Sequence, residues 1–212
     1  IIMRCNMKHI LCFGDSNTHG STTEFLGRYD YDDRWTIILE KLLGDGYHVI
    51  EEGLGGRTTV FDDPFRPGKN GSAAISCILQ THKPLDLVII MLGTNDTKQV
   101  YNASVKSIAY GVEVIIEKIR NEDMPKPEIL IVSPIRIEEG IENGRFESYD
   151  ITSHTKSLEF PFWMKRTAER TGSYFFDAAS VAHAGSDFLH MTKDSHKALA
   201  EALCPIVKGI IG

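Results

Sequence analysis

Short apolar runs alternate with amphipathic stretches along the whole chain. Five runs have strand length and are bounded by polar, glycine or proline residues; they span residues 10–13, 47–50, 86–92, 129–132 and 173–177. Between them, apolar residues recur at helical spacing; the predicted helices span residues 35–43, 72–82, 104–121, 153–171 and 193–208. Strands that alternate with helices favour one parallel sheet with helices on both faces. The 212 residues therefore predict a single domain, 1–212, of the α/β class.

Glycine and proline set the expected ends of these elements. Gly44 and Pro84 end the first two helices. Pro161 falls near the middle of the fourth helix, where a proline marks a kink. Residues 135–151 are expected to form a loop or an excursion from the sheet.

Polar turns follow three of the predicted strands. Ser16 stands in the turn after the first strand, a Gly55–Gly56 pair follows the second, and Asn95 follows the third. Right-handed crossovers place these strand ends on one edge of the sheet, where ligands bind in open α/β folds. A serine hydroxyl is a weak nucleophile at neutral pH. Ser16 therefore needs a base and donors for the oxyanion that its attack creates.

The histidine that best suits the role of base is His190. Asp187 precedes it by three residues, so on one turn the carboxylate can hold the imidazole tautomer while the other ring nitrogen faces the serine. Asp194 and His196 form a rival pair, but their spacing at a helix start suits the role less well, and Asp194 can serve the helix N-terminus. His19 is a weaker alternative, because it lies just beyond the serine turn.

Three donors are expected to hold the oxyanion. They are the backbone N–H of Ser16, a backbone N–H in the Gly55–Gly56 loop, and the side-chain amide of Asn95. Each feature is common by itself, and an asparagine after a strand is usually a cap. Their chain order and their positions at strand ends together indicate an active site.

Composition narrows the range of partners. A net charge of −6 and a pI near 5.8 argue against a nucleic-acid surface and against a basic membrane-binding face. No segment is long enough to span a bilayer. The glycine-rich loop at 53–56 lacks the lysine of a P-loop and the spaced glycines of a dinucleotide site. The chemistry therefore requires no cofactor and no metal.

The cysteines and the N-terminal segment bear on the compartment. Cys5, Cys12, Cys77 and Cys204 show no metal-ligand spacing and are expected to be reduced, with Cys12 and Cys77 buried in apolar segments. The first residues lack the apolar stretch and cleavage site of a signal peptide, which predicts a cytoplasmic location unless a leader has been removed.

Four blocks of the chain resemble those of the SGNH (also called GDSL) serine hydrolases. The blocks are Gly14-Asp15-Ser16-Asn17, the loop 53–59, Gly93-Thr94-Asn95-Asp96 and Asp187-x-x-His190. Residues 49–59 and 84–98 are similar to the bacterial aryl esterase/acyltransferase branch of that family. The resemblance implies a three-layer α/β/α, flavodoxin-like fold with a five-stranded parallel sheet.

The resemblance also implies roles for the site residues. Ser16 would be the nucleophile, His190 the base and Asp187 the acid that orients it. Gly56 and Asn95 would join Ser16 as oxyanion donors, with Gly55 the alternative to Gly56.

One residue departs from the family motif, and the motif does not fix the roles of one loop and of three aromatic residues. Asn17 replaces the leucine of the commonest motif, a change expected not to touch the chemistry. Members of this branch use loops such as 135–163 to shape the acyl pocket and to build oligomers, so a homo-oligomer is expected. Tyr29, Trp35 and Phe188 indicate a partly apolar pocket, or else core or interface.

The sequence thus predicts a serine esterase that hydrolyses small acetyl or aryl esters through an acyl-enzyme, with acyl transfer where an alcohol outcompetes water. Within the same fold the alternatives are a carbohydrate deacetylase and a lysophospholipase or thioesterase. Outside enzymes, the alternative is a flavodoxin-like protein that binds phosphate or flavin, which would leave Asp187 and His190 without a role.

Overall fold

The computed structural model describes residues 7–24 and 27–212, so Cys5 lies outside the described residues. The strands are β1 (Lys8–Gly14), β2 (Tyr47–Gly53), β3 (Leu87–Met91), β4 (Glu128–Ser133) and β5 (Tyr174–Asp177). The α-helices are α1 (Ser16–His19), α2 (Trp35–Leu43), α3 (Gly71–His82), α4 (Val105–Asn121), α5 (Ile151–Thr171) and α6 (Lys193–Ile211). Short 3-10 helices span Tyr31–Asp33, Asn95–Thr97, Gln99–Tyr101, Ile141–Asn143 and Ala178–Ser180.

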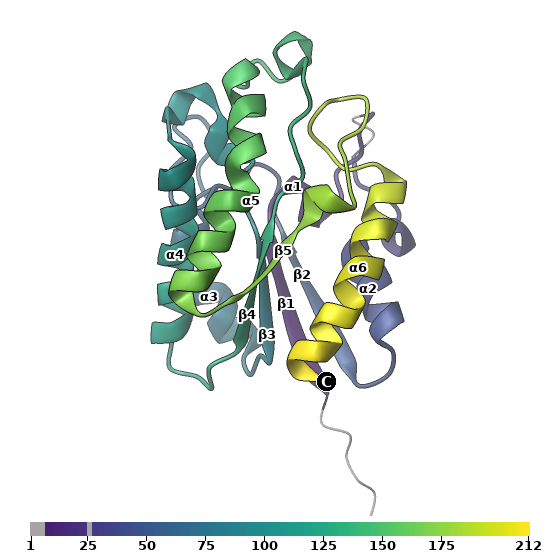
Figure 1. Cartoon of the computed structure of the whole chain (residues 1–212). Coiled ribbons are helices and arrows are strands. Elements are labelled where there is room, and N and C mark those ends of the chain that lie inside the picture. The colour runs from purple at the N-terminus through teal and green to yellow at the C-terminus, as the bar shows by residue number, and fades with distance from the viewer. Residues whose placement is uncertain (1–6, 25–26) are drawn as a thin grey trace, which may run out of the picture.

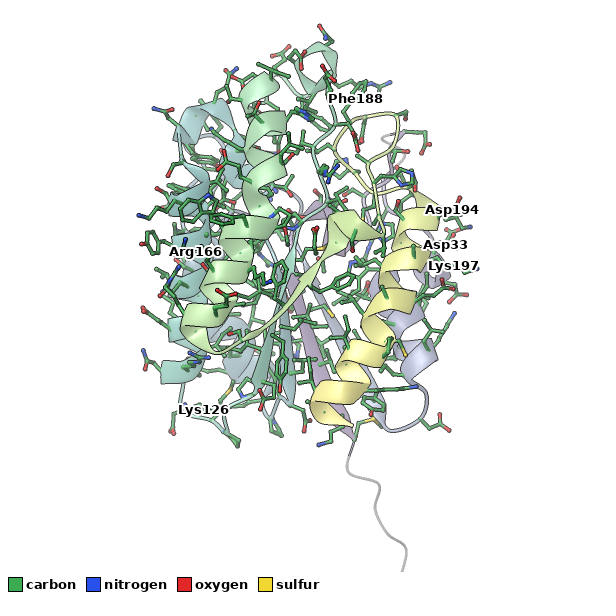
Figure 2. The ribbon with its side chains drawn as sticks, in the orientation of Figure 1. Asp33, Lys126, Arg166, Phe188, Asp194 and Lys197 are labelled. Carbon is green, nitrogen blue, oxygen red and sulfur yellow. The ribbon has the colours of Figure 1, made fainter. Side chains whose placement is uncertain are left out.

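The five strands form one parallel sheet in the order β2-β1-β3-β4-β5. This is the flavodoxin-like strand order. Helices α3, α4 and α5 cover one face, and α2 and α6 cover the other (Figure 1). The predicted three-layer α/β/α fold is therefore confirmed. The carboxyl ends of the strands, the short α1 and the start of α6 lie at one end of the molecule, as does the loop that carries Phe188 (Figures 1 and 2).

Two apolar layers, one on each face of the sheet, form the core. Helix α4 buries the face that its apolar periodicity predicted, which includes Ile108, Ile115 and Ile119. A third, smaller cluster joins Ile137, Ile141, Tyr149 and Leu189. That cluster lies in the segment predicted as a loop, and it anchors the segment to the turn before His190.

Several element boundaries differ from the predicted ones. The second strand continues to Gly53, because its backbone pairs with β1 as far as Gly14. Within it, the Glu51 carboxylate accepts hydrogen bonds from Arg34 at 2.8 Å and from the Thr36 hydroxyl at 2.5 Å. As predicted, Pro161 lies near the middle of the helix that ends at Thr171, here α5.

The prediction that Cys77 is buried is wrong. Cys77 is exposed on α3, because Ile75 and Leu79 define the buried face of that helix and a position between them points away from the core. Cys12 is buried in β1 as predicted, and burial raises the pKa of its thiol well above the usual value. The described cysteines, Cys12, Cys77 and Cys204, form no disulfide. Across residues 7–24 and 27–212, none of the helices has the length and apolar content needed to cross a membrane.

Candidate active site

Ser16 opens α1 directly after β1, where the sequence predicted a turn. Asp15 caps this short helix by accepting a hydrogen bond from the Asn17 N–H at 2.9 Å. The turn into the helix is tight, and a Cβ on Gly14 would lie 2.0 Å from Thr18 Oγ1. Only glycine therefore fits at position 14, and the chain presents Ser16 at the carboxyl edge of the sheet with 7% of its surface exposed.

Asp187 and His190 form a buried pair in the turn before α6. The Asp187 carboxylate lies 2.6 Å from His190 Nδ1 and also accepts the backbone N–H groups of Leu189 and His190 at 3.0 and 2.8 Å. Phe188 adopts a positive φ of 64°, which closes the turn tightly enough for these bonds. The spacing of Asp187 and His190 thus brings the two side chains together as predicted.

Asn17 ties the serine helix to the histidine turn. Its amide nitrogen donates to the Leu189 carbonyl at 3.3 Å, and its amide oxygen accepts the Met191 N–H at 2.8 Å. The two bonds hold the residues on either side of His190. The expectation that the change at position 17 does not touch the chemistry stays a prediction, and the side chain links the turn that carries His190 to the helix that Ser16 opens.

Asn95 is buried on the other side of Ser16. Its amide nitrogen donates to the Arg57 carbonyl at 3.1 Å and to Asp15 Oδ2 at 3.5 Å. Its amide oxygen accepts the Tyr149 hydroxyl at 2.9 Å, which fixes the orientation of the amide. Asp15 and Asn17, which flank Ser16 in the chain, thus contact Asn95 and the two neighbours of His190 respectively.

The glycine-rich loop is fastened beside Asn95 by the side chain of Arg57. Arg57 donates to the Gly14 carbonyl at 2.9 Å and stacks over the Phe13 ring at 4.3 Å. Gly56 has a φ of +83°, a conformation that favours glycine. The sequence motif contained Arg57, but its role could not be read from spacing alone.

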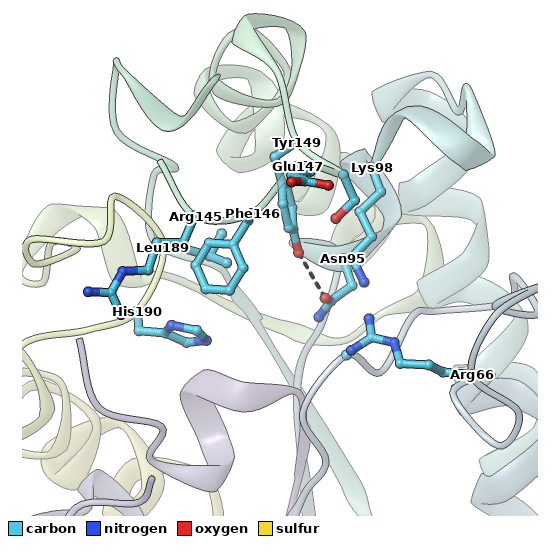
Figure 3. Close-up of a pocket in the computed structure, with 11 residues that line it drawn as sticks. Arg66, Asn95, Lys98, Arg145, Phe146, Glu147, Tyr149, Leu189 and His190 are labelled. Atoms are coloured by element: carbon cyan, nitrogen blue, oxygen red, sulfur yellow. Dashed lines mark hydrogen bonds between the residues drawn. The ribbon is translucent and has the colours of Figure 1, made fainter. Parts of the chain in front are cut away.

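A cavity of about 380 Å³ opens between these groups. Of the described residues, those that line it are Gly56, Arg66, Asn95, Lys98, Arg145, Phe146, Glu147, Ser148, Tyr149, Leu189 and His190. His190 and Asn95 lie on opposite sides of it, with Phe146 and Tyr149 between and above them (Figure 3). Gly56, rather than Gly55, faces this space, which favours it as the loop donor.

The rival histidines lie elsewhere. His196 is fully buried in the first turn of α6, where its Nδ1 accepts the Trp35 N–H at 3.2 Å and burial lowers its pKa to about 3. A ring held neutral in this way does not serve as a base for a solvent-accessible substrate. His19 ends α1, and its pKa is lowered by burial and by the nearby Arg28. Asp194 lies in the first turn of α6, where it suits the helix dipole.

Two buried carboxyl groups lie beneath the site. Burial raises the pKa of Asp15 to about 6 against the opposing effects of the Asn17 N–H and His190. Burial likewise raises the pKa of Asp96 to about 7, although Thr59 donates two hydrogen bonds to it. The site thus holds two buried carboxyl groups, Asp15 and Asp96, whose pKa values are raised toward neutral pH.

The aromatic residues of the cavity differ from those that the sequence singled out. Trp35 belongs to the core, Tyr29 donates to the Met191 carbonyl, and Phe188 packs on Gly140. The cavity contains Phe146 and Tyr149 instead, with Phe146 edge-on to His190 at 5.6 Å between ring centroids. Both come from the 135–151 excursion, whose path could not be deduced because the segment has neither helical nor strand periodicity.

Comparison with known proteins identifies the family of this chain. The model of the GDSL-like Lipase/Acylhydrolase family matches residues 12–198. A carbohydrate acetylesterase family member from Sinorhizobium meliloti is 34% identical, with a TM-score of 0.91 over 97% of this chain and 100% of that one. The native aryl esterase of M. smegmatis is 37% identical, with a TM-score of 0.86 over 96% of this chain and 99% of that one.

A curated relative gives a shorter match. The acetylxylan esterase of Xylanibacter ruminicola is 36% identical over 89 residues, which are 42% of this chain and 17% of that protein. The match therefore spans a small part of that relative, whereas the family model and the solved structures span nearly all of this chain. The chain belongs to the GDSL-like lipase/acylhydrolase family, the SGNH hydrolases, and is a carboxylic-ester hydrolase.

Proposed function

We propose that the protein hydrolyses small acyl esters through an acyl-enzyme on Ser16. The observation that carries the proposal is the buried Asp187–His190 pair at 2.6 Å, whose histidine lines a cavity together with Asn95 and Gly56. A carboxylate on Nδ1 sets the tautomer and the orientation of the imidazole, which is how a base is positioned for a weak serine nucleophile.

The reaction proceeds in two halves. His190 takes the hydroxyl proton as Ser16 Oγ attacks the ester carbonyl carbon, and a tetrahedral oxyanion forms. The C–O bond to the alcohol then breaks, and His190 returns the proton to the departing alkoxide. In the second half His190 removes a proton from water, which attacks the acyl-enzyme and releases the acid and free Ser16. An alcohol in place of that water gives acyl transfer.

The oxyanion is held by the N–H of Ser16, the N–H of Gly56 and the amide nitrogen of Asn95. The positive φ of Gly56 and the bond from Tyr149 to the Asn95 oxygen support this assignment, because both fix donors before substrate arrives. Loss of one such donor typically raises the barrier by about 3 to 4 kcal/mol.

The cavity of about 380 Å³ has room for a small acyl ester, and many of the side chains that line it are polar or charged. The polar lining, together with acetylesterases among the relatives, favours acetylated carbohydrates as a second candidate substrate class. Assembly into a homo-oligomer and a cytoplasmic location remain predictions.

The test is turnover of p-nitrophenyl acetate by wild type, Ser16→Ala and His190→Ala, with longer p-nitrophenyl esters to set the chain-length limit. Each site variant is expected to lose activity by a factor of about 10⁴ or more. His48→Ala removes an exposed histidine on β2 and is the matched control, expected to keep full activity. Full activity in Ser16→Ala, or an inactive wild type across short acyl chains, would contradict the proposal.

A further inference from the structure

Lys98 is a buried cation whose charge the catalytic mechanism does not use. It is 3% exposed, and among the residues that the structure describes its ammonium has no hydrogen-bond partner. The closest carboxylate oxygen, Asp63 Oδ2, lies 3.9 Å away. The ammonium also lies 5.7 Å from the centroid of the Tyr149 ring. A lysine ammonium carries three donors, and burying it with none of them hydrogen-bonded is unfavourable. Its donors are therefore available to a bound group.

The position of Lys98 relative to the reaction centre is fixed. Its backbone N–H donates to the Asn95 carbonyl at 3.3 Å, so the two residues belong to the same short turn. Lys98 and Asn95 line the same cavity, and Figure 3 shows the lysine side chain running down toward the Asn95 amide. A group bound by Lys98 would thus lie within the length of a small molecule from the proposed oxyanion donors.

Arg66 is the second cation at this place. Its guanidinium lies 3.4 Å from Asp63 Oδ2 and points toward Asn95 from the other side (Figure 3). The cavity continues into a second one of about 540 Å³, which shares Arg66, Lys98 and Ser148 with the first. A substrate that extends beyond the scissile ester therefore passes between the two cations.

The charges around this passage leave an excess of positive charge. Arg66, Lys98 and Arg145 line the two cavities, against the carboxylates of Asp63 and Glu147. This excess occurs in a chain whose net charge is −6. The carboxyl groups of Asp15 and Asp96 lie behind Asn95 and have raised pKa values, so burial weakens their negative charge near neutral pH. A cationic cavity with low-dielectric walls attracts anions.

We propose that Lys98 and Arg66 form an anion-binding subsite for a carboxylate or phosphate group that the ester substrate carries. The inference rests on the proposed function and deepens it, because it names the substrate class. The substrate is a small acyl ester of an anionic molecule, such as an acylated hydroxy acid or an acetylated acidic sugar. The anion gives the Lys98 ammonium its missing hydrogen bonds and orients the ester against Asn95.

The experiment compares two esters of the same shape that differ in charge, 4-acetoxybenzoate and 4-acetoxybenzamide, by their kcat/KM values at low salt. In wild type the anionic ester is expected to be preferred at least about tenfold, the scale of one buried charge-assisted hydrogen bond. Lys98→Met keeps the volume and removes the charge, and Arg66→Gln removes the outer cation. Both are expected to lower the preference, Lys98→Met about tenfold and Arg66→Gln by a few fold.

The ratio of the two esters isolates the subsite, since the intrinsic reactivity of each ester cancels between variants. Lys197→Met is the matched control, because Lys197 is an exposed lysine on α6, away from the cavity (Figure 2). It is expected to keep the wild-type preference. A third ester, 4-acetoxyphenyl phosphate, tells whether carboxylate or phosphate is the better ligand, and preference for either anion over the amide supports the subsite.

The experiment distinguishes failure of the anion subsite from failure of the proposed esterase function. Equal use of 4-acetoxybenzoate and 4-acetoxybenzamide by an active, Ser16-dependent enzyme would overturn the anion subsite and leave the esterase intact. An unchanged preference for the anionic ester in Arg66→Gln would also overturn the anion subsite. This variant can be measured even if Lys98→Met does not fold, because the Arg66 side chain is about half exposed and its removal does not open the core. Wild type that hydrolyses none of these esters, nor p-nitrophenyl acetate, would instead overturn the proposed function.

Discussion

Replacing Asn17 by leucine, the residue of the commonest family motif, tests how the site is held together. The change keeps the side-chain volume similar but removes both hydrogen bonds to the turn around His190, at 3.3 Å to the Leu189 carbonyl and 2.8 Å from the Met191 N–H. Each buried backbone group that loses its partner costs about 1 to 3 kcal/mol. The pair is therefore worth roughly 2 to 6 kcal/mol, which lowers Tm by about 5 to 20 °C in a chain of this size.

The catalytic loss has a separate cause. Without Asn17 the turn is no longer held on both sides of His190, and a displacement of about 1 Å costs on the order of 100-fold in rate. We expect kcat on p-nitrophenyl acetate to fall by that factor, measured at 25 °C where the variant is folded, with little change in KM. Asn121→Leu makes the same substitution at an exposed position at the end of α4 and should alter neither quantity.

A single result would show that Asn17 does not hold the turn around His190. If Asn17→Leu keeps kcat within twofold of wild type and Tm within about 2 °C, the two hydrogen bonds neither position His190 nor stabilise the turn. A loss of Tm without a loss of kcat would leave Asn17 with a structural role only.

Three further predictions concern the Tyr149 hydroxyl, the buried His196 and the backbone of Gly56. Tyr149→Phe removes the hydroxyl that orients the Asn95 amide at 2.9 Å and should lower kcat about tenfold with KM within threefold, less than the loss of a whole oxyanion donor, in the same esterase assay. His196 is neutral in the fold, with a pKa lowered by burial to about 3, so it contributes stability above pH 6.5 that is lost as pH falls toward 3. We expect the free energy of unfolding, measured by urea titration, to fall by roughly 3 kcal/mol between pH 7 and pH 4 because of this group. The fall should be smaller in His196→Asn, whose amide oxygen can accept the same backbone N–H. Gly56→Ala imposes a Cβ at a φ of +83° and should lower kcat about tenfold, whereas Gly55→Ala, where a Cβ meets nothing within 4 Å, should be nearly neutral in kinetics.

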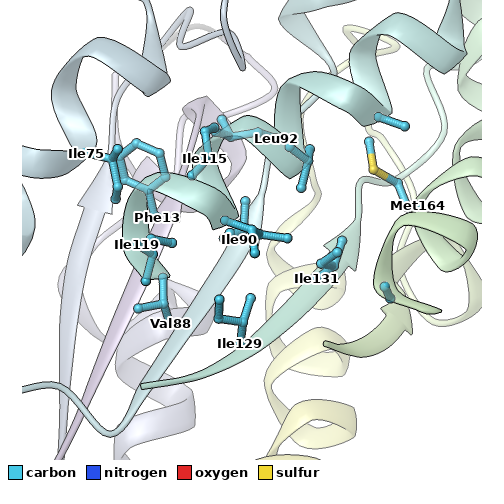
Figure 4. Packing of buried hydrophobic residues seen from close by; sticks show 14 of the residues in the cluster. Phe13, Ile75, Val88, Ile90, Leu92, Ile115, Ile119, Ile129, Ile131 and Met164 are labelled. Carbon is cyan, nitrogen blue, oxygen red and sulfur yellow. The ribbon is translucent and has the colours of Figure 1, made fainter. Parts of the chain in front are cut away.

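Periodicity predicted the fold because burial follows it closely. The apolar positions of α4 recur at helical spacing, and Ile115 and Ile119 pack against the strand residues Val88 and Ile90 in the core (Figure 4). The almost wholly apolar run before Asn95 is buried along its full length, as a central parallel strand must be. Cys77 was misjudged because a helix buries one face, and an apolar neighbourhood in sequence does not place a residue on that face.

The site was predictable where it depends on strand ends and short spacings, and unpredictable where it depends on tertiary packing. Ser16, Asn95 and the Asp187–His190 pair follow from the order of the strand-end turns. Tyr149 lines the cavity because the 135–151 segment packs against the protein through the cluster around Ile141. That segment has no periodic pattern from which this packing could be predicted. Asn17 was overlooked because its partners are backbone groups more than 170 residues away along the chain.

The central claim, that Ser16 is the nucleophile, is tested most directly by covalent labelling with an organophosphonate that carries a good leaving group. Attack by the serine oxygen displaces the leaving group and leaves a stable adduct that mimics the tetrahedral intermediate. Peptide mass spectrometry should place one adduct on Ser16, with esterase activity lost in proportion, and Ser16→Ala should remain unlabelled. Full labelling of Ser16→Ala, or loss of activity with the adduct on another residue, would contradict the account.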